Sequence, residues 1–215
     1  TDLHIDETLL AEASVAALIR FDSADRDAGG RFTGVFKALK TSVVDKLQQE
    51  LVALQATAAL LEQQRESIGL QQMQVSALFE KVLLELHREV DLQAEQQSLR
   101  AAAQLYRHTR RVWVPRVLPV STASLTAMEF IPGVHPEQGR DYRGGARRVA
   151  QLIFEAIICM PLFSTAERAL FHADPHGGNI LIVEQDTFPH LQIGLIDWSL
   201  TVYLSRSQRT QIMQM

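Results

Sequence analysis

The stretch from Phe171 to Leu200 constrains this chain most, because polar residues flank two short apolar runs. Ile180–Val183 is rich in β-branched residues, and Leu191–Ile196 is a second apolar run after a turn-forming segment. An antiparallel hairpin would bring the start of the first run beside the end of the second. Asn179 and Asp197 would then meet at one open end, where an amide oxygen and a carboxylate suit a hard cation such as Mg²⁺.

The spacing of the polar residues in this stretch is also informative. H-x-D-x-x-x-x-N, then a strand pair and a D-aromatic-small tripeptide, resembles a protein-kinase catalytic loop with its metal-binding aspartate. In that layout Asp174 is the catalytic base or orienting acid, and Asn179 and Asp197 hold the metals that bridge the nucleotide phosphates. His172 and His176 would support the loop.

Two other interpretations of these residues stay open. The segment from Asp174 to Asn179 is rich in turn formers, so a plain polar turn would also account for it. Alternatively, His172, Asp174 and His176 would ligate a metal, since H-x-D-x-H resembles a hydrolase metal motif. The other histidines form no second cluster at ligand spacing, which counts against the hydrolase interpretation.

The bulk composition narrows the class of protein. A chain of 215 residues can bury a core as one domain or two small lobes, and a net charge of −4 gives no reason to expect a nucleic-acid partner. The single cysteine, Cys159, fits a reducing compartment such as the cytoplasm and a packed core position. No segment is long and apolar enough to span a bilayer. Because the chain begins at Thr1, we expect an excerpt of a longer protein.

The first forty residues predict a hairpin over a phosphate site. Leu9–Phe21 is alanine-rich and becomes β-like, Asp22–Gly30 is a polar turn, and Gly34–Lys40 is a strand. Alanines and Ser14 occupy the place of a kinase Gly-rich loop, so Ala13 and Ser14 are candidate nucleotide contacts. A short helical turn is the alternative.

Two lysines compete for the phosphate-binding position of a V-A-I-K strand. Lys37 follows Val35-Phe36 inside the strand, whereas Lys40 ends it and can extend into water. We therefore favour Lys37.

Two long helices are expected next, over Thr41–Gln64 and about Gln71–Tyr106, each with an apolar stripe along one face. We expect the stripe of the second helix to be core, and coiled-coil pairing is the alternative. A kinase needs one helix carboxylate to hold the strand lysine. Glu89, Asp91 and Glu95 are the candidates, and Asp91 and Glu95, four residues apart, share a helix face.

The chain then predicts strands over Arg111–Val117, closed by Pro115, and Ser124–Phe130. The second strand enters a Pro-Gly linker typical of a hinge between two lobes, where the Glu129 carbonyl and the Ile131 amide would meet an adenine edge. An ordinary strand exit is the alternative. Gly144–Arg168 should be mainly helical, with Pro161 ending its first piece.

With these residues placed, the chain resembles the UbiB (AarF/ADCK) family of atypical protein-kinase-like proteins. HADPHGGN with IDWS resembles the family's H-[GA]-D-P-H-P-G-N and D-F-G, EVDLQAE its E-x-D-x-x-x-E signature, and AEASVAA its Ala-rich loop. Ala17, Gly177 and the D-W-S tripeptide depart from the family pattern, and the K-x-G-Q helix is not in this sequence.

The resemblance implies an α+β, protein-kinase-like two-lobed fold. A small β-rich N-lobe with long inserted helices would span residues 1–130, and a partial, mostly helical C-lobe with the catalytic loop would span 131–215. By the same resemblance Glu95 pairs with Lys37, and Glu89 and Asp91 form the family's own acidic motif.

The resemblance also implies a Mg²⁺-dependent atypical kinase or ATPase that binds ATP or ADP. It further implies a link to prenylquinone (ubiquinone) biosynthesis, with membrane-associated lipid or quinone-biosynthesis partners and a place peripheral to a membrane. Two alternatives stay open. One is a small-molecule phosphotransferase of the aminoglycoside or choline kinase type, and the other is a catalytically weak nucleotide-binding scaffold.

Overall fold

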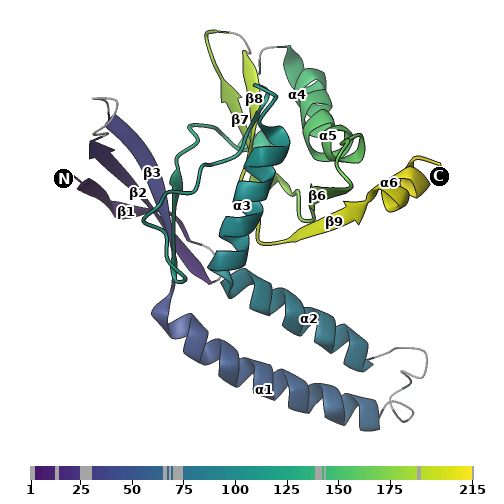
Figure 1. Cartoon of the computed structure of the whole chain (residues 1–215). Helices are drawn as coiled ribbons and strands as arrows, with labels where there is room; N and C mark the ends of the chain where they lie inside the picture. Colours follow the sequence, from purple (N-terminus) through teal and green to yellow (C-terminus); the bar gives the residue numbers. More distant parts are fainter. Residues whose placement is uncertain are drawn as a thin grey trace.

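A four-stranded antiparallel sheet forms the N-terminal part of the chain. The computed structural model describes residues 3–12, 15–24, 31–64, 67, 69, 75–138, 142, 144–187 and 190–214. The sheet has the order β1-β2-β3-β5, built from β1 (Leu3–Glu12), β2 (Ala16–Ala24), β3 (Arg31–Leu39) and β5 (Leu125–Glu129) (Figure 1). The expected strand at Gly34–Lys40 is therefore present but begins three residues earlier. The alanine-rich segment spans the β1–β2 connection, at the other end of β2 from the polar turn.

Aromatic packing fixes β2 against β3. The Phe21 ring stacks on Phe36 with ring centroids 4.1 Å apart and lies across Gly34, which faces it in the β2–β3 pairing. A Cβ atom at Gly34 would come within 2.3 Å of the Phe21 ring. A residue with a side chain at position 34 would therefore displace the stack that orients β3.

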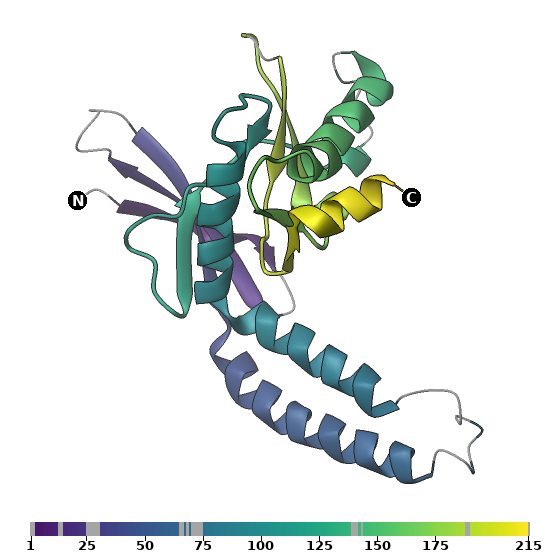
Figure 2. The ribbon, with the colours of Figure 1, turned by 45° about the vertical axis from the view of Figure 1, so that its right-hand side comes forward.

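A long helical hairpin follows the sheet. The helices α1 (Thr41–Gln63) and α2 (Val75–Val90) pack along each other and extend away from the rest of the molecule (Figures 1 and 2). Leu51 and Ala58 are buried, but Leu78 and Val82 are 50% and 39% exposed. The expectation that the whole α2 stripe is core was wrong, because in the described part of the chain α2 packs mainly against α1.

The predicted helix ending at Tyr106 is broken in two at Asp91. There the backbone has φ −87° and ψ 77°, and the Asp91 carboxylate accepts a hydrogen bond from the Ala94 amide at 2.9 Å. Asp91 is thus the N-cap of a new helix, α3 (Leu92–Tyr106), and not a residue on a helix face shared with Glu95. A short carboxylate that satisfies a free amide favours a cap over a helix interior.

A second sheet has the order β4-β8-β7. The strands β7 (Ile180–Glu184) and β8 (Leu191–Leu195) form the predicted antiparallel hairpin. The expected strand at 111–117 was too long: β4 covers only Val112–Trp113 and pairs in parallel with β8. Beyond Pro115 the chain turns to the first sheet, where the Leu118 amide donates to the Ala127 carbonyl of β5 at 2.8 Å.

The remaining elements carry the catalytic-loop motif. A helix runs from α4 (Gly145–Phe154) through a π-helical segment (Glu155–Cys159) into α5 (Met160–Leu162). Pro161 lies inside α5 and does not end the first piece as expected. The chain continues as β6 (Arg168–His172), paired antiparallel with β9 (Thr201–Ser205), and α6 (Arg206–Met213). Together with β7 and β8, these strands and helices give residues 131–215 both helical and β structure.

One cluster of buried apolar side chains connects these parts. It includes Val35 of β3, Leu99 of α3, Ile193 of β8 and Trp198, which has no exposed surface. β4 comes before residue 130 in the chain but pairs in the second sheet, and the chain then returns to the first sheet as β5. The predicted boundary between the two lobes at residue 130 stays a prediction. None of the described helices combines the length and apolarity that crossing a membrane requires.

Candidate nucleotide-binding site

A buried lysine lies at the centre of the site. Lys37 projects from the second half of β3, two residues before the strand ends, and is 6% exposed. Its Nζ atom donates to Glu95 Oε1 at 2.8 Å and to Asp197 Oδ2 at 3.3 Å. The structure thus brings together three residues that are far apart in the sequence.

Helix α3 holds Glu95 against the sheet. Asp91 caps the helix one turn before Glu95, and the next residue, Gln96, anchors the helix to the β5 region. Gln96 Nε2 donates to the Thr122 carbonyl at 2.8 Å and to Thr126 Oγ1 at 3.1 Å. The Glu95 carboxylate is consequently fixed beside Lys37, although its Oε2 atom has no hydrogen-bond partner among the described residues.

Burial and mutual charge shift the pKa values of this triad. Burial disfavours the Lys37 ammonium, but Glu95 and Asp197 outweigh burial and raise the pKa of Lys37. Burial, together with the nearby Asp197 charge, raises the pKa of Glu95 although Lys37 acts in the opposite direction. Burial also acts on Asp197, but Lys37 and the hydrogen bonds from Ser199 together lower the pKa of that carboxyl. Lys37 and Asp197 are therefore a stable cation and anion at neutral pH.

Asp197 adopts an unusual backbone conformation. Its φ of 57° lies in the left-handed region, which non-glycine residues seldom adopt. Ser199 Oγ donates to Asp197 Oδ1 at 2.7 Å, and the buried Trp198 indole donates to the Leu195 carbonyl at 3.1 Å. These contacts hold the turn and direct the carboxylate to the cavity that Lys37 lines. Strained residues of this kind cluster at functional sites.

Histidines support the loop between β6 and β7. His172 Nδ1 accepts from the Asp174 amide at 3.2 Å, and its Nε2 lies 3.2 Å from the Ile196 carbonyl. Nε2 must carry a proton to bond a carbonyl, and Nδ1 must lack one to accept from an amide, so the ring is neutral. Burial lowers the pKa of His172, in agreement with a neutral ring. His176 Nδ1 accepts from the Gly178 amide at 3.0 Å, and its Nε2 lies 3.5 Å from Asp174 Oδ2.

Sequence reasoning missed a further histidine, His135, which follows the hinge. Its Nδ1 lies 3.2 Å from the carbonyls of both Gly177 and Ile180. Both partners are acceptors, so Nδ1 is the protonated nitrogen of the ring. His135 thereby clamps the backbone on either side of Asn179, whose Nδ2 donates to the Asp174 carbonyl at 3.0 Å. The only sequence signal was a histidine shortly after the Pro-Gly linker.

A cavity of about 240 Å³ joins these elements. Its polar lining comes from Lys37, Glu95, Asn179 and Asp197, and its hinge side from Glu129 and Ile131. Leu10 and Ala11 of β1 cover one wall, while Ala13 and Ser14 lie outside the described residues. The Glu129 carboxylate points to Trp113, whose indole donates to it at 3.1 Å.

Other predicted site residues lie elsewhere. Lys40 forms an ion pair at 2.8 Å with Glu12, at the end of β1, and does not line the cavity. Glu89 lies in the last turn of α2 and Asp91 caps α3, and neither is among the residues that line the cavity. Asp174 does not line it either, but its backbone carbonyl accepts a hydrogen bond from Asn179, which does. Gly177 abuts Glu137: a Cβ there would come 2.5 Å from Glu137 Oε1 and displace that flexible side chain.

The donor set fits Mg²⁺ bound together with phosphates. An amide oxygen and an ionised carboxylate are hard oxygen ligands, and Mg²⁺ often binds through one or two carboxylates plus substrate phosphates. Within the described ranges no cluster of three His, Cys, Asp or Glu side chains would hold a metal by itself. The hydrolase interpretation of His172, Asp174 and His176 is therefore not supported.

Comparisons with known proteins show the family and the fold. The model of the ABC1 atypical kinase-like domain matches residues 3–215. A curated relative from Dictyostelium discoideum, a probable serine/threonine-protein kinase abkD, is 29% identical over 119 residues, which are 54% of this chain and 17% of that protein. The chain therefore spans only a small part of that relative.

Two solved structures share the fold. Rv3197 from Mycobacterium tuberculosis, solved with erythromycin, has 22% identity and a TM-score of 0.72 over 95% of this chain and 48% of its own. The Rio2 kinase from Chaetomium thermophilum, solved as an ADP/Mg²⁺-phosphoaspartate complex, has 16% identity and a TM-score of 0.51 over 93% of this chain and 48% of its own. Both confirm a kinase-like α+β fold. The family match confirms the resemblance seen in the sequence: the chain belongs to the ABC1 (UbiB-type) atypical kinase-like family.

Proposed function

We propose that this domain binds ATP or ADP together with Mg²⁺ and that it cleaves the γ-phosphoryl group of ATP, which passes to water or to an acceptor hydroxyl and leaves ADP. The observation that carries the proposal is the contact of Lys37 with both Glu95 and Asp197, at 2.8 and 3.3 Å, on the wall of one cavity. A buried ammonium held between two acids is placed to receive phosphate oxygens. The kinase-like fold and family support the same conclusion.

Each residue has a separate proposed role. Lys37 binds phosphate oxygens and Glu95 holds it in place, while the backbone of Glu129 and Ile131 meets the adenine edge. Asn179 and Asp197 hold Mg²⁺, which neutralises the charge that develops on the phosphates. Asp174 orients the attacking water or hydroxyl, and the His176 ring, 3.5 Å away, keeps the Asp174 carboxylate in position.

The present cavity is small for a nucleotide. A volume of about 240 Å³ lies below the roughly 300–1,000 Å³ of usual ligand sites. Leu10 and Ala11 of β1 form its outer wall, and β1 is an edge strand whose pairing with β2 shifts register twice. We therefore propose that outward movement of the β1 end admits the nucleotide.

The test is ATP turnover with and without acceptors. We expect slow release of inorganic phosphate in Mg²⁺ without any acceptor, which defines an ATPase. A stimulated rate with formation of a phosphorylated alcohol, on adding choline or an aminoglycoside, would identify a small-molecule phosphotransferase instead. Nucleotide binding without turnover under either condition would identify a scaffold.

From the family resemblance we further propose a role in prenylquinone (ubiquinone) biosynthesis, beside a membrane in a reducing compartment and with lipid or quinone-pathway partners. This part rests on the resemblance alone. Quinone content in cells that lack the whole protein tests it: the native protein should restore the quinone, and one carrying Asp197→Asn should not. Equal rescue by both would separate the pathway role from nucleotide chemistry.

A further inference from the structure

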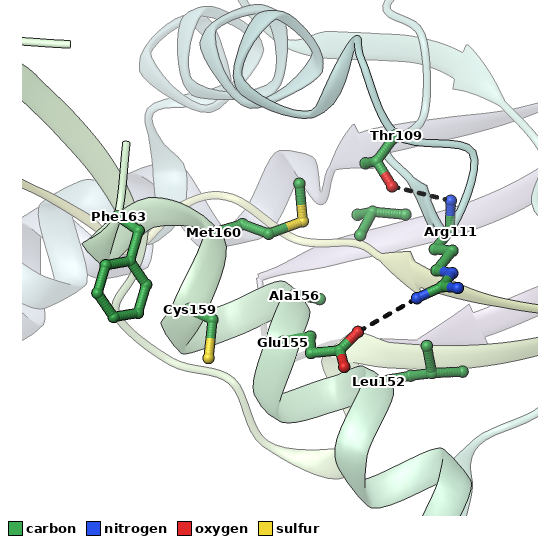
Figure 3. Close-up of a pocket in the computed structure, with 9 residues that line it drawn as sticks. Thr109, Arg111, Leu152, Glu155, Ala156, Cys159, Met160 and Phe163 are labelled. Atoms are coloured by element: carbon green, nitrogen blue, oxygen red, sulfur yellow. Dashed lines mark hydrogen bonds and ion pairs between the residues drawn. The ribbon is translucent and has the colours of Figure 1, made fainter. Parts of the chain in front are cut away.

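A second cavity, of about 440 Å³, lies between the loop after α3 and the helix formed by α4, the π-helical segment and α5. Val112, Leu152 and Ala156 are buried and contribute apolar lining, and Met160 and Phe163 lie farther along the helix (Figure 3). None of its lining residues lines the nucleotide cavity. Its volume falls within the range of small-molecule sites, roughly 300–1,000 Å³.

The helix that borders this cavity is distorted. Glu155–Cys159 forms a π-helical turn, a rare geometry that often occurs at functional sites. The Tyr106 hydroxyl donates to the Ala156 carbonyl within this turn at 2.8 Å. Helix α3 thus supplies the hydrogen bond that helps to hold the widened turn open along the cavity.

One end of the cavity is polar, and the Arg111 guanidinium there has more hydrogen-bond donors than Glu155 uses. Arg111 Nη1 lies 3.6 Å from Glu155 Oε2, and Glu155 Oε1 already accepts from Gln151 Nε2 at 2.7 Å. Both carboxylate oxygens are therefore engaged. The guanidinium has five N–H donors, and the ion pair with Glu155 is its only side-chain interaction within the described part of the chain.

The loop after α3, which borders the cavity, is positively charged like Arg111 itself. Residues 107–113 include Arg107, Arg110 and Arg111 and no acidic residue. Among the lining residues Arg111 offsets Glu155, and what remains at this end of the cavity is a surplus of hydrogen-bond donors on Arg111, which suits an anion. A cation would find the Glu155 carboxylate already occupied by Arg111 and Gln151.

We propose that this cavity binds an aromatic carboxylate. The carboxylate would take the open donors of Arg111, in the paired geometry that guanidinium groups favour. The ring would lie on the apolar floor, beside the Met160 thioether and the Phe163 ring, both of which make favourable contacts with aromatic groups. Phe163 is 67% exposed, and such a ligand would cover it.

Methyl NMR of the whole chain tests the proposal with 2-naphthoate as probe. Protein labelled at the methionine methyl groups reports on Met160 inside the cavity and on Met213, in α6, outside it. We expect a saturable shift of the Met160 signal, with a Kd on the order of 1 mM or tighter for a ligand of this size, and no shift at Met213. No nucleotide is present, so the result does not depend on the proposed function.

Two comparisons isolate the carboxylate contact. Arg111→Met should weaken naphthoate binding about tenfold or more, whereas Arg147→Met, an exposed arginine on α4, should leave it unchanged. Uncharged 2-naphthalenemethanol should bind the native chain about tenfold more weakly than naphthoate. An unmoved Met160 signal at 10-fold the expected Kd, or equal binding by native and Arg111→Met proteins, would overturn the proposal.

Discussion

Lys37 and Glu95 form an ion pair of 2.8 Å, from the second half of β3 to the first turn of α3, with almost no exposed side-chain surface on either residue. Such a pair is costly to break, because the residue that remains is a buried, uncompensated charge. Replacing both partners by neutral residues of similar shape is far less costly. The pair therefore offers a way to separate stability from phosphate binding.

Lys37→Met should lower the rate of nucleotide turnover about 100-fold or more and lower the free energy of unfolding by about 3–5 kcal/mol. Lys40→Met is the matched control, since Lys40 pairs with Glu12 at the surface and should leave turnover within about twofold. The double variant Lys37→Met/Glu95→Gln should recover much of the stability but none of the activity. Greater damage from Lys40→Met, measured by phosphate release, would refute the assignment of the lysine.

His135→Ala should impair the metal-binding loop without unfolding the protein. Loss of its contacts to Gly177 and Ile180 frees the backbone around Asn179, so we expect about a tenfold higher Mg²⁺ requirement for nucleotide binding. His135→Asn keeps a side-chain N–H donor and should restore part of the affinity. His190→Ala, at the distant β7–β8 turn, is the control, and an equal effect there would exclude a local role for His135.

Protonation of His172 should destabilise the fold at low pH. Burial lowers the pKa of His172 below its unfolded value of about 6.5, so the unfolded chain binds the proton more readily. The contribution of His172 is fully present above pH 6.5 and is lost as pH falls through the lower, folded-state pKa. Thermal unfolding from pH 8 to pH 5 should show this loss. His172→Gln should flatten the profile, whereas exposed His87→Gln should keep the native slope.

Several local features of the fold and of the candidate site could be predicted from the sequence. The hairpin of β7 and β8 followed from two short apolar runs separated by turn residues, and its antiparallel geometry brought Asn179 near residue 196. Lys37 was preferred over Lys40 because a mid-strand position is fixed by its neighbours. Both inferences rest on local pattern, which short strands express well.

Features that depend on competition between local and tertiary contacts were not predictable. Apolar periodicity continued through Asp91, and only the side-chain cap on Ala94 shows that two helices fit better than one. The strand from Val112 divides because Pro115 cannot donate and two different sheets compete for its flanks. The exposed Leu78 and Val82 carry the same pattern as core residues, so periodicity alone could not show what covers them.

Calorimetry of ADP binding with Mg²⁺ and with EDTA tests the central claim most directly. The phosphates must approach the Asp197 carboxylate, which Lys37 offsets only in part, so we expect Mg²⁺ to tighten binding about tenfold or more. Asp197→Asn should remove that difference while leaving the unfolding transition in place, because its side chain is 37% exposed and asparagine tolerates positive φ. Equal affinity of the native chain for ADP in Mg²⁺ and in EDTA would contradict the assignment of a Mg²⁺-nucleotide site.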